Sequence, residues 1–115
     1  MSPDLGAASQ VRDAAPLFAA LGDETRFGLL VRLASSGPGS IARLSARAQV
    51  SRQAITKHLE ILNEAGLVTS ARRGRERIWQ IETDRLAEAR RYLELISRQW
   101  DDALGRLKRF VEAPD

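Results

Sequence analysis

The chain has 115 residues, 43% of them hydrophobic and 29% charged, with a formal net charge of +3. This length suits one domain with a modest core. The absence of cysteine excludes disulfides, thiolate metal sites and cysteine nucleophiles. No apolar run approaches the roughly 20 residues of a membrane span. The N-terminal segment has neither the basic start nor the apolar core of a secretory signal, so we expect the protein in the cytoplasm.

Positive charge is concentrated in the middle of the chain. Residues 41–80 contain eight Lys or Arg and three Glu, whereas the segments on either side each hold one more acidic than basic residue. A localised basic patch is typical of a surface that binds phosphates. The alternative is a solvated basic face without a partner.

The first predicted elements are a tail and two helices. Residues 1–12 are small and polar and predict a flexible tail. A short helix is predicted from Ala14 to Leu21, ended by Gly22. Asp23 then suits the N-cap of a second helix. Four apolar residues recur in that helix at helical spacing and are expected to be buried: Phe27, Leu30, Val31 and Ala34.

A helix-turn-helix unit is predicted next. The break at residues 37–39 precedes Ser40, which caps a short third helix through about Ala48. A tight link leads to Ser51, the cap of a fourth helix that stops at Gly66. This arrangement is typical of the helix-turn-helix. The residues of the fourth helix expected to face inward are Ile55, Leu59 and Leu62.

The outward face of the fourth helix has the chemistry of base recognition. Arg52 can grip guanine through two hydrogen bonds, and Gln53 can do the same with adenine. Ser51, Thr56 and Lys57 suit phosphate contacts, and the Thr56 methyl also suits thymine. The alternative is that Arg52 and Gln53 contact only phosphates or water. His58, the single histidine, is expected to pack beside this helix or to contact a phosphate.

An arginine-rich hairpin follows. Two strands, at residues 67–73 and 77–81, flank Gly74, which permits a tight turn. Arginines at such a tip can enter a narrow minor groove or clamp the backbone; those at this tip are Arg72, Arg73 and Arg75. Alternation predicts that Arg77 faces the body of the domain and that Trp79 packs against it. The alternative is a mobile, solvated hairpin.

A long helix is predicted from about Asp84 to Val111. Leu86, Leu93, Trp100 and Leu107 repeat every seven residues, flanked by Ile96, Ala103, Leu104 and Val111. This face is too apolar to remain in water, so it packs on its own domain or on a second copy. Charged residues, Arg98 among them, form the opposite side.

Catalysis is not indicated. Asp23 and Glu24 lie at a helix start, where capping explains them better than general acid/base work. No nucleophile–base constellation, phosphate-cradling glycine loop or cofactor fingerprint is present, so neither an enzyme nor a cofactor is predicted. A metal site is not predicted either, because the sequence contains no second histidine and no cysteine that could bind a metal together with His58.

Taken together, three segments resemble the arsenic-repressor (ArsR-type) family of bacterial winged-helix transcription regulators. They are LGDETRFGLLVRLA, VSRQAITKHLEILNEAGLV and RRGRERIWQI, and the likeness covers about Leu17 to Val111. The resemblance implies a mainly α fold with a small β-hairpin wing and dimerisation helices at both ends. It divides the chain into a tail (1–12), a winged helix-turn-helix domain (13–82) and a C-terminal dimerisation helix (83–112).

The family likeness also implies partners and residue roles. It implies a homodimer that binds a roughly palindromic double-stranded operator and represses nearby genes, released by an unidentified small-molecule or protein inducer. The reading-helix roles fall on Ser51, Arg52, Gln53, Thr56, Lys57 and His58, and the wing roles on Arg73 and Arg75. The dimer interface is assigned to Leu17, Phe18, Leu86, Leu93, Ile96, Trp100, Leu104 and Leu107.

The chain departs from metal-sensing members of that family. Its third helix has Ile41, Arg43 and Leu44 in place of a cysteine pair, and its terminal helix has no histidine. The resemblance is therefore to the branch without the known metal ligands. A competing hypothesis is a protein-interaction module that uses the same scaffold without DNA; the basic middle segment argues against it.

Overall fold

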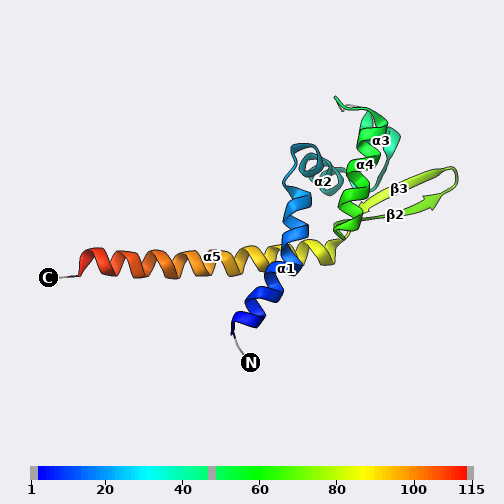
Figure 1. Ribbon diagram of the computed structural model, residues 1–115. Coiled ribbons are helices and arrows are strands. Elements are labelled where there is room, and N and C mark those ends of the chain that lie inside the picture. The colour runs from blue at the N-terminus through cyan, green and yellow to red at the C-terminus, as the bar shows by residue number, and fades with distance from the viewer. Residues whose placement is uncertain (1–2, 47–48, 114–115) are drawn as a thin grey trace.

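The computed structural model describes residues 3–46 and 49–113, which form a mainly helical fold with a small antiparallel sheet (Figure 1). The helices are α1 (Pro3–Leu21), α2 (Glu24–Ser36), α3 (Ile41–Ser45), α4 (Arg52–Glu64) and α5 (Thr83–Glu112). The strands are β1 (Gly39–Ser40), β2 (Val68–Arg73) and β3 (Glu76–Ile81). The predicted fold class, a winged helix-turn-helix with a long C-terminal helix, is confirmed.

Three of the helices begin where side-chain caps were predicted. The Asp23 carboxylate accepts from the Arg26 N–H at 3.0 Å, at the start of α2. The Ser40 and Ser51 hydroxyl oxygens accept from the third residue beyond them at 3.2 and 3.1 Å, at the starts of α3 and α4. Each cap satisfies a backbone donor that the helix leaves free and stabilises by roughly 1 kcal/mol.

The sheet contains a strand that the sequence did not reveal. Its order is β1-β3-β2, all antiparallel, with Gly39 opposite Trp79. Residues 37–39 were predicted only as a break. Gly37 does end α2, with a φ of 79°, but Gly39 and Ser40 then pair with β3. Two paired residues are too few to show an alternating pattern, so only the tertiary structure reveals this strand.

The core lies where α1, α2 and α4 meet the sheet. Ile55, Leu59 and Leu62 are at most 1% exposed, as their spacing predicted. Trp79 packs into the same cluster, which confirms its expected place against the body of the domain.

The prediction for α2 is confirmed for Leu30, which is buried, and wrong for the other three residues, because the buried face is rotated by about one residue around the helix. Phe27 and Val31 are 55% and 50% exposed, and Ala34 is exposed too. The buried face is formed by Leu29, Leu30 and Leu33. Both sets are spaced like a helix face, and the second is chosen because α2 packs against α1, α4 and β3 at once.

Residues 3–12 are helical, where a flexible tail was predicted. Pro3 is the first helical residue, a position where the missing proline N–H costs nothing. The helix runs on to Leu21 and packs on α5, and the Asp13 carbonyl accepts a hydrogen bond from Arg85 at 2.9 Å. Helix α1 also crosses the expected boundary at residue 13. The third helix, by contrast, ends at Ser45, and its predicted end at Ala48 lies outside the described residues.

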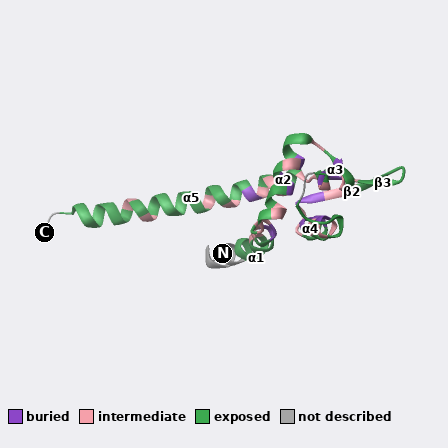
Figure 2. Cartoon of the chain, turned by 90° about the horizontal axis from the view of Figure 1, so that it is seen from above, coloured by how far each residue is buried: buried purple, intermediate pink, exposed green. Residues whose placement is uncertain are grey.

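Helix α5 packs on the domain through its N-terminal half, where Tyr92 and Leu95 are still half-buried beside α1. Its 30 residues span roughly 45 Å, and the molecule measures 71 Å along its longest axis. Ala89 is buried and Leu86 half-buried, whereas the helix beyond Leu95 projects away and is largely exposed (Figure 2). None of the described helices is long and apolar enough to cross a bilayer.

Candidate nucleic-acid interface

The first turn of α4 presents the predicted reading residues to solvent. The side chains of Ser51, Arg52, Gln53 and Lys57 are exposed. The Ser51 oxygen accepts the Ala54 N–H, which leaves the Ser51 O–H free to donate. The Thr56 hydroxyl donates to the Arg52 carbonyl at 2.9 Å, so its proton is used within the helix and its oxygen remains an acceptor.

The far end of α4 is firmly anchored. Gly66 has a φ of 79°, and the Gly66 and Leu67 N–H groups donate back to Asn63 and Leu62, each at 2.9 Å. This is the double hydrogen-bond pattern that closes a helix at a glycine. The Asn63 amide also donates to the Val68 carbonyl at 2.9 Å, which ties the helix to β2. The reading helix therefore leads directly into the wing without a free linker.

His58 is one of the residues that the prediction grouped with the DNA contacts. Its side chain is 22% exposed and turns toward the start of α2. The Nδ1 atom lies 3.3 Å from Nη1 of Arg26 and 3.8 Å from Oδ2 of Asp23. The backbone hydrogen bond from Arg26 and the charge of its guanidinium lower the pKa of the Asp23 carboxyl, against the raising effect of partial desolvation. This position agrees with the expectation that His58 packs beside the reading helix, and its contact with DNA stays a prediction.

The wing is a tight hairpin with an arginine-rich tip. Arg73 pairs with Glu76 across a two-residue turn of Gly74 and Arg75. Gly74 has a φ of 65°, and no non-glycine residue in the described chain has a positive φ, which is the pattern of a type II′ turn. Arg72, Arg73 and Arg75 are exposed, and among the described residues none forms an ion pair.

Arg77 does not face the body of the domain as expected. Its side chain is exposed, and its guanidinium donates to the Ser70 hydroxyl on the neighbouring strand at 2.8 Å. Strand alternation places Arg77 on the same face as Trp79, but the hairpin already extends beyond the core at this position (Figure 1). Arg77 therefore stiffens the wing.

Helix α4 and the wing lie at one end of the molecule, away from the projecting half of α5 (Figure 1). This end carries the positive charge that the sequence concentrates in residues 41–80. The surface thus combines base-reading side chains on a rigid helix with phosphate-seeking arginines on a hairpin.

Three other arginines hold the helices in place by capping the C-terminal ends of their neighbours. Arg26 donates to the Ala20 carbonyl at the end of α1 at 2.6 Å. Arg32 donates to the Leu44 and Arg43 carbonyls of α3 at 2.6 and 3.1 Å. Arg85 donates to the Ala65 carbonyl after α4 at 3.1 Å. Cations are favoured at helix C-termini, where carbonyls lack partners.

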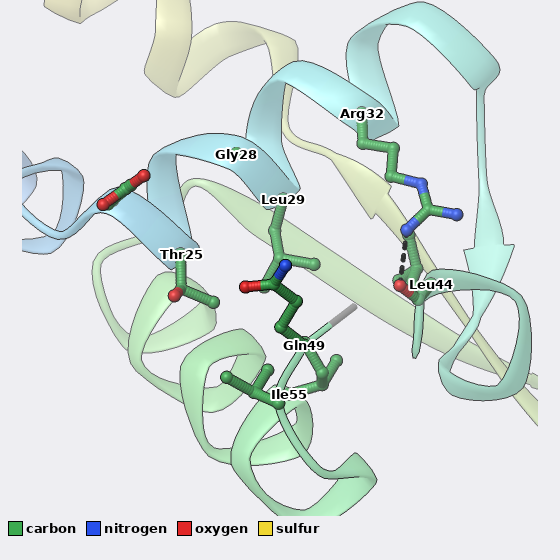
Figure 3. A pocket seen from close by; sticks show the side chains of 9 residues that line it. Thr25, Gly28, Leu29, Arg32, Leu44, Gln49 and Ile55 are labelled. Carbon is green, nitrogen blue, oxygen red and sulfur yellow. Dashed lines mark hydrogen bonds between the residues drawn. The ribbon is translucent and has the colours of Figure 1, made fainter. Parts of the chain in front are cut away.

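The Arg32 contact lies beside a cavity of about 490 Å³ between α2 and the helix-turn-helix. Figure 3 shows Thr25 and Leu29 of α2 on one side, Gln49 and Ile55 on the other, and the Arg32 bond to Leu44 closing one end. Since α2 and the turn are not closely packed here, the Arg32 guanidinium is a main polar link between α2 and α3.

Loss of this link should destabilise the domain. We expect Arg32→Met, which keeps an apolar stem but removes both donors, to lower the free energy of unfolding by about 2 kcal/mol in urea denaturation. Arg43→Met is the matched control, because among the described residues the Arg43 guanidinium donates to the Pro38 carbonyl alone, at 3.4 Å. Equal losses from both variants would show that Arg32 has no special structural role.

Within the described residues, no group of three or more His, Cys, Asp or Glu side chains is arranged to hold a metal ion. The exposed polar groups of the reading helix and the wing are arginine, lysine, amide and hydroxyl groups. A helix-turn-helix with an exposed, polar reading helix and a basic hairpin defines a winged helix-turn-helix DNA-binding protein.

Comparison with known proteins gives the family. Residues 21–71 match the family described as "Helix-turn-helix domain". The chain is 34% identical over 94 residues to the HTH-type transcriptional regulator Rv2034 of Mycobacterium tuberculosis, covering 82% of this chain and 84% of that protein. It is 41% identical over 68 residues to an uncharacterized HTH-type transcriptional regulator of Bacillus subtilis, YuzN, covering 54% and 74%.

A solved structure agrees with these relatives. An ArsR-like transcriptional regulator from Rhodococcus sp. RHA1 superposes with a TM-score of 0.77 and 39% identity, covering 92% of this chain and 99% of that one. The chain belongs to the ArsR family of winged helix-turn-helix transcription regulators. It is therefore a DNA-binding regulator of transcription and not an enzyme.

Proposed function

We propose that the protein is a homodimeric repressor that reads a roughly palindromic operator with α4 and clamps the DNA with its wing. The observation that carries this proposal is the first turn of α4, where the side chains of Arg52 and Gln53 are exposed. Below them, Ile55, Leu59 and Leu62 are buried in the core, so the opposite face of α4, with Arg52 and Gln53, is turned outward. A recognition helix in the major groove contacts base edges with its N-terminal residues.

The proposed division of labour follows from side-chain chemistry. The planar fork of Arg52 matches two acceptors of guanine, and the amide of Gln53 matches the donor and acceptor of adenine. Ser51 and Lys57 are better suited to phosphate contacts, and Thr56 is suited to a phosphate or to the methyl group of thymine. The operator should therefore contain a guanine or an adenine at the bases nearest the start of α4.

Dimerisation is proposed from the apolar face of α5. Beyond its first turns this face is largely exposed, with Leu93 at 54%, Trp100 at 64% and Leu107 at 58%. Ile96 and Leu104 continue it at 44% and 55%. An apolar stripe of this length with a seven-residue repeat is typical of a helix that pairs with another helix.

The predicted dimer interface has to be corrected near the core of the domain, where it included Leu17. Leu17 is 0% exposed within its own chain, so it belongs to the core and cannot contact a second copy. Phe18 and Leu86 are half-buried against the same core and remain at the edge of the proposed interface. Two-fold symmetry would place the two reading helices in major grooves roughly 34–36 Å apart, or a multiple of that distance.

A direct test begins with selection of duplexes by the wild-type protein from a random library. Fluorescence anisotropy should then show at least 1,000-fold tighter binding to the selected duplex than to a scrambled duplex at physiological salt, since specific and non-specific affinities commonly differ by about that factor or more. The selected sequences should contain an inverted repeat. Equal affinities for both duplexes would rule out sequence-specific regulation.

The wing should contribute affinity without sequence preference. We expect Arg75→Ala to weaken binding to the selected and scrambled duplexes by the same factor. We also expect the slope of log affinity against log salt to fall by about one for each phosphate that Arg75 neutralises. A titration series in sodium chloride measures both. An unchanged salt slope with altered sequence preference would mean that Arg75 reads bases.

A further inference from the structure

Arg26 joins three helices through one side chain. Its Nε donates to the Ala20 carbonyl at 2.6 Å and its Nη2 approaches the Ala19 carbonyl at 3.5 Å, both in the last turn of α1. Its Nη1 lies 3.3 Å from Nδ1 of His58, in the middle of α4. Arg26 itself sits in the first turn of α2, where its backbone N–H donates to the Asp23 cap at 3.0 Å.

His58 is the part of α4 that completes this junction. A guanidinium can only donate, so the contact requires Nδ1 of His58 to accept and the proton of the neutral ring to lie on Nε2. His58 follows Gln53 by five positions, which is about 140° further around the helix. The ring therefore lies on a different face of α4 from the reading residues, turned toward α1 and α2.

The apolar contacts of α4 do not by themselves fix its exact position and rotation, and the contact between Arg26 and His58 can do so. Ile55, Leu59 and Leu62 hold the helix against the core, but burial of apolar surface is not directional and permits small sliding and rotation. A hydrogen bond depends steeply on distance and angle. Base reading tolerates errors of only about 0.5 Å in the position of the side chains. A polar contact on the inner side of α4 thus fixes what the apolar core leaves variable.

We propose that Arg26 and His58 are positioning residues for DNA recognition, a rigid joint that sets the angle of the reading helix relative to α1. This inference rests on the proposed function, because it assumes that α4 reads bases. Helix α1 packs on α5, the helix assigned to the dimer interface. The joint therefore connects α1 and α5, which would set the distance between the two reading helices of the dimer, to α4, which each copy would insert into the major groove.

The test uses the full-length dimer, a duplex selected by the wild-type protein from a random library, and a scrambled duplex of the same composition. His58→Leu keeps similar bulk and removes the acceptor, whereas His58→Gln restores one through its Oε1 atom. Ser35→Ala is the matched control, since the Ser35 hydroxyl donates to the Val31 carbonyl of its own helix and, within the described part of the chain, to no other helix. Arg26→Lys and the pair Arg26→Lys/His58→Leu complete a double-mutant cycle.

We expect His58→Leu to lose about tenfold in affinity for the selected duplex. Binding to the scrambled duplex, the salt slope and the sedimentation coefficient should stay those of the wild type. His58→Gln should recover most of the loss. The double variant should bind the selected duplex no more weakly than the weaker-binding of the two single variants, because both changes break the same contact.

Two results would overturn the inference while leaving the proposed function intact. One is a His58→Leu protein that discriminates between the duplexes as well as the wild type. The other is an equal loss on both duplexes with a reduced salt slope, which would make His58 a phosphate contact. If the wild type itself fails to discriminate, the proposed function fails, and the joint loses its role with it.

Discussion

Replacing Trp100 by Glu should convert the protein to a monomer and weaken binding to a two-half-site operator by about 100-fold or more. Trp100 is 64% exposed in the single chain, so the substitution leaves the core of its own domain untouched. In the proposed dimer it would bury a carboxylate in the middle of the α5 stripe, which is strongly unfavourable. A monomer binds each half-site separately and loses the gain from linking two binding events.

The variant Arg98→Gln is the control for this experiment. It changes the net charge by the same single unit, and it lies about 160° away from Trp100 on α5. Analytical ultracentrifugation at micromolar concentration should show a monomer for Trp100→Glu and a dimer for Arg98→Gln and the wild type. A dimeric Trp100→Glu protein with full operator affinity would contradict the assignment of this stripe to the interface.

Removal of both reading side chains should abolish sequence preference while sparing most non-specific affinity. Each well-placed two-hydrogen-bond contact to a base contributes about 1–3 kcal/mol of discrimination. Loss of both contacts in Arg52→Ala/Gln53→Ala should therefore weaken binding to the selected duplex by roughly 30- to 25,000-fold. Both positions are exposed and alanine is an excellent helix former, so α4 and its Ser51 cap should persist. The affinity for the scrambled duplex should fall only slightly, because the double variant removes one positive charge, that of Arg52, from the DNA-binding surface.

Comparison with the wing variant Arg75→Ala distinguishes a loss of sequence preference from a general loss of DNA affinity. Arg75→Ala should shift both duplexes together, whereas the α4 double variant should bring their affinities close to each other. Circular dichroism and thermal unfolding establish that each variant is folded. If all these variants lost affinity and preference in the same proportion, the separation between a base-reading helix and a backbone-clamping wing would be wrong.

Local signals in the sequence were sufficient for the elements that carry the interface. The caps at Asp23, Ser40 and Ser51, the glycine at the end of α4 and the turn at Gly74 all act within a few residues of chain. Their chemistry depends on backbone donors and positive φ angles that neighbouring residues supply or permit. The inward face of α4 was equally clear, since its three apolar residues repeat at helical spacing and polar or charged residues occupy most of the positions between them.

Features that depend on distant contacts could not be predicted from the chain alone. β1 exists because Gly39 meets Trp79, forty residues later. Helix α2 buries Leu29 instead of Phe27 because three neighbours meet on that side. Residues 3–12 are helical in a helix that packs on α5. In the sequence, Leu17 looked as available to a partner as Trp100, but its own core covers it.

The arginines show the same division most clearly. By itself the sequence determined that this chain is a basic winged helix-turn-helix, because caps, turns and periodic burial are local properties. Nothing in the sequence near Arg26, Arg32 or Arg75 says which carbonyl or phosphate each guanidinium will reach. Only the tertiary structure decided that the first two cap neighbouring helices and the third remains free at the wing tip. A long, charged side chain takes its role from the carbonyls within its reach, and folding alone brings those carbonyls near.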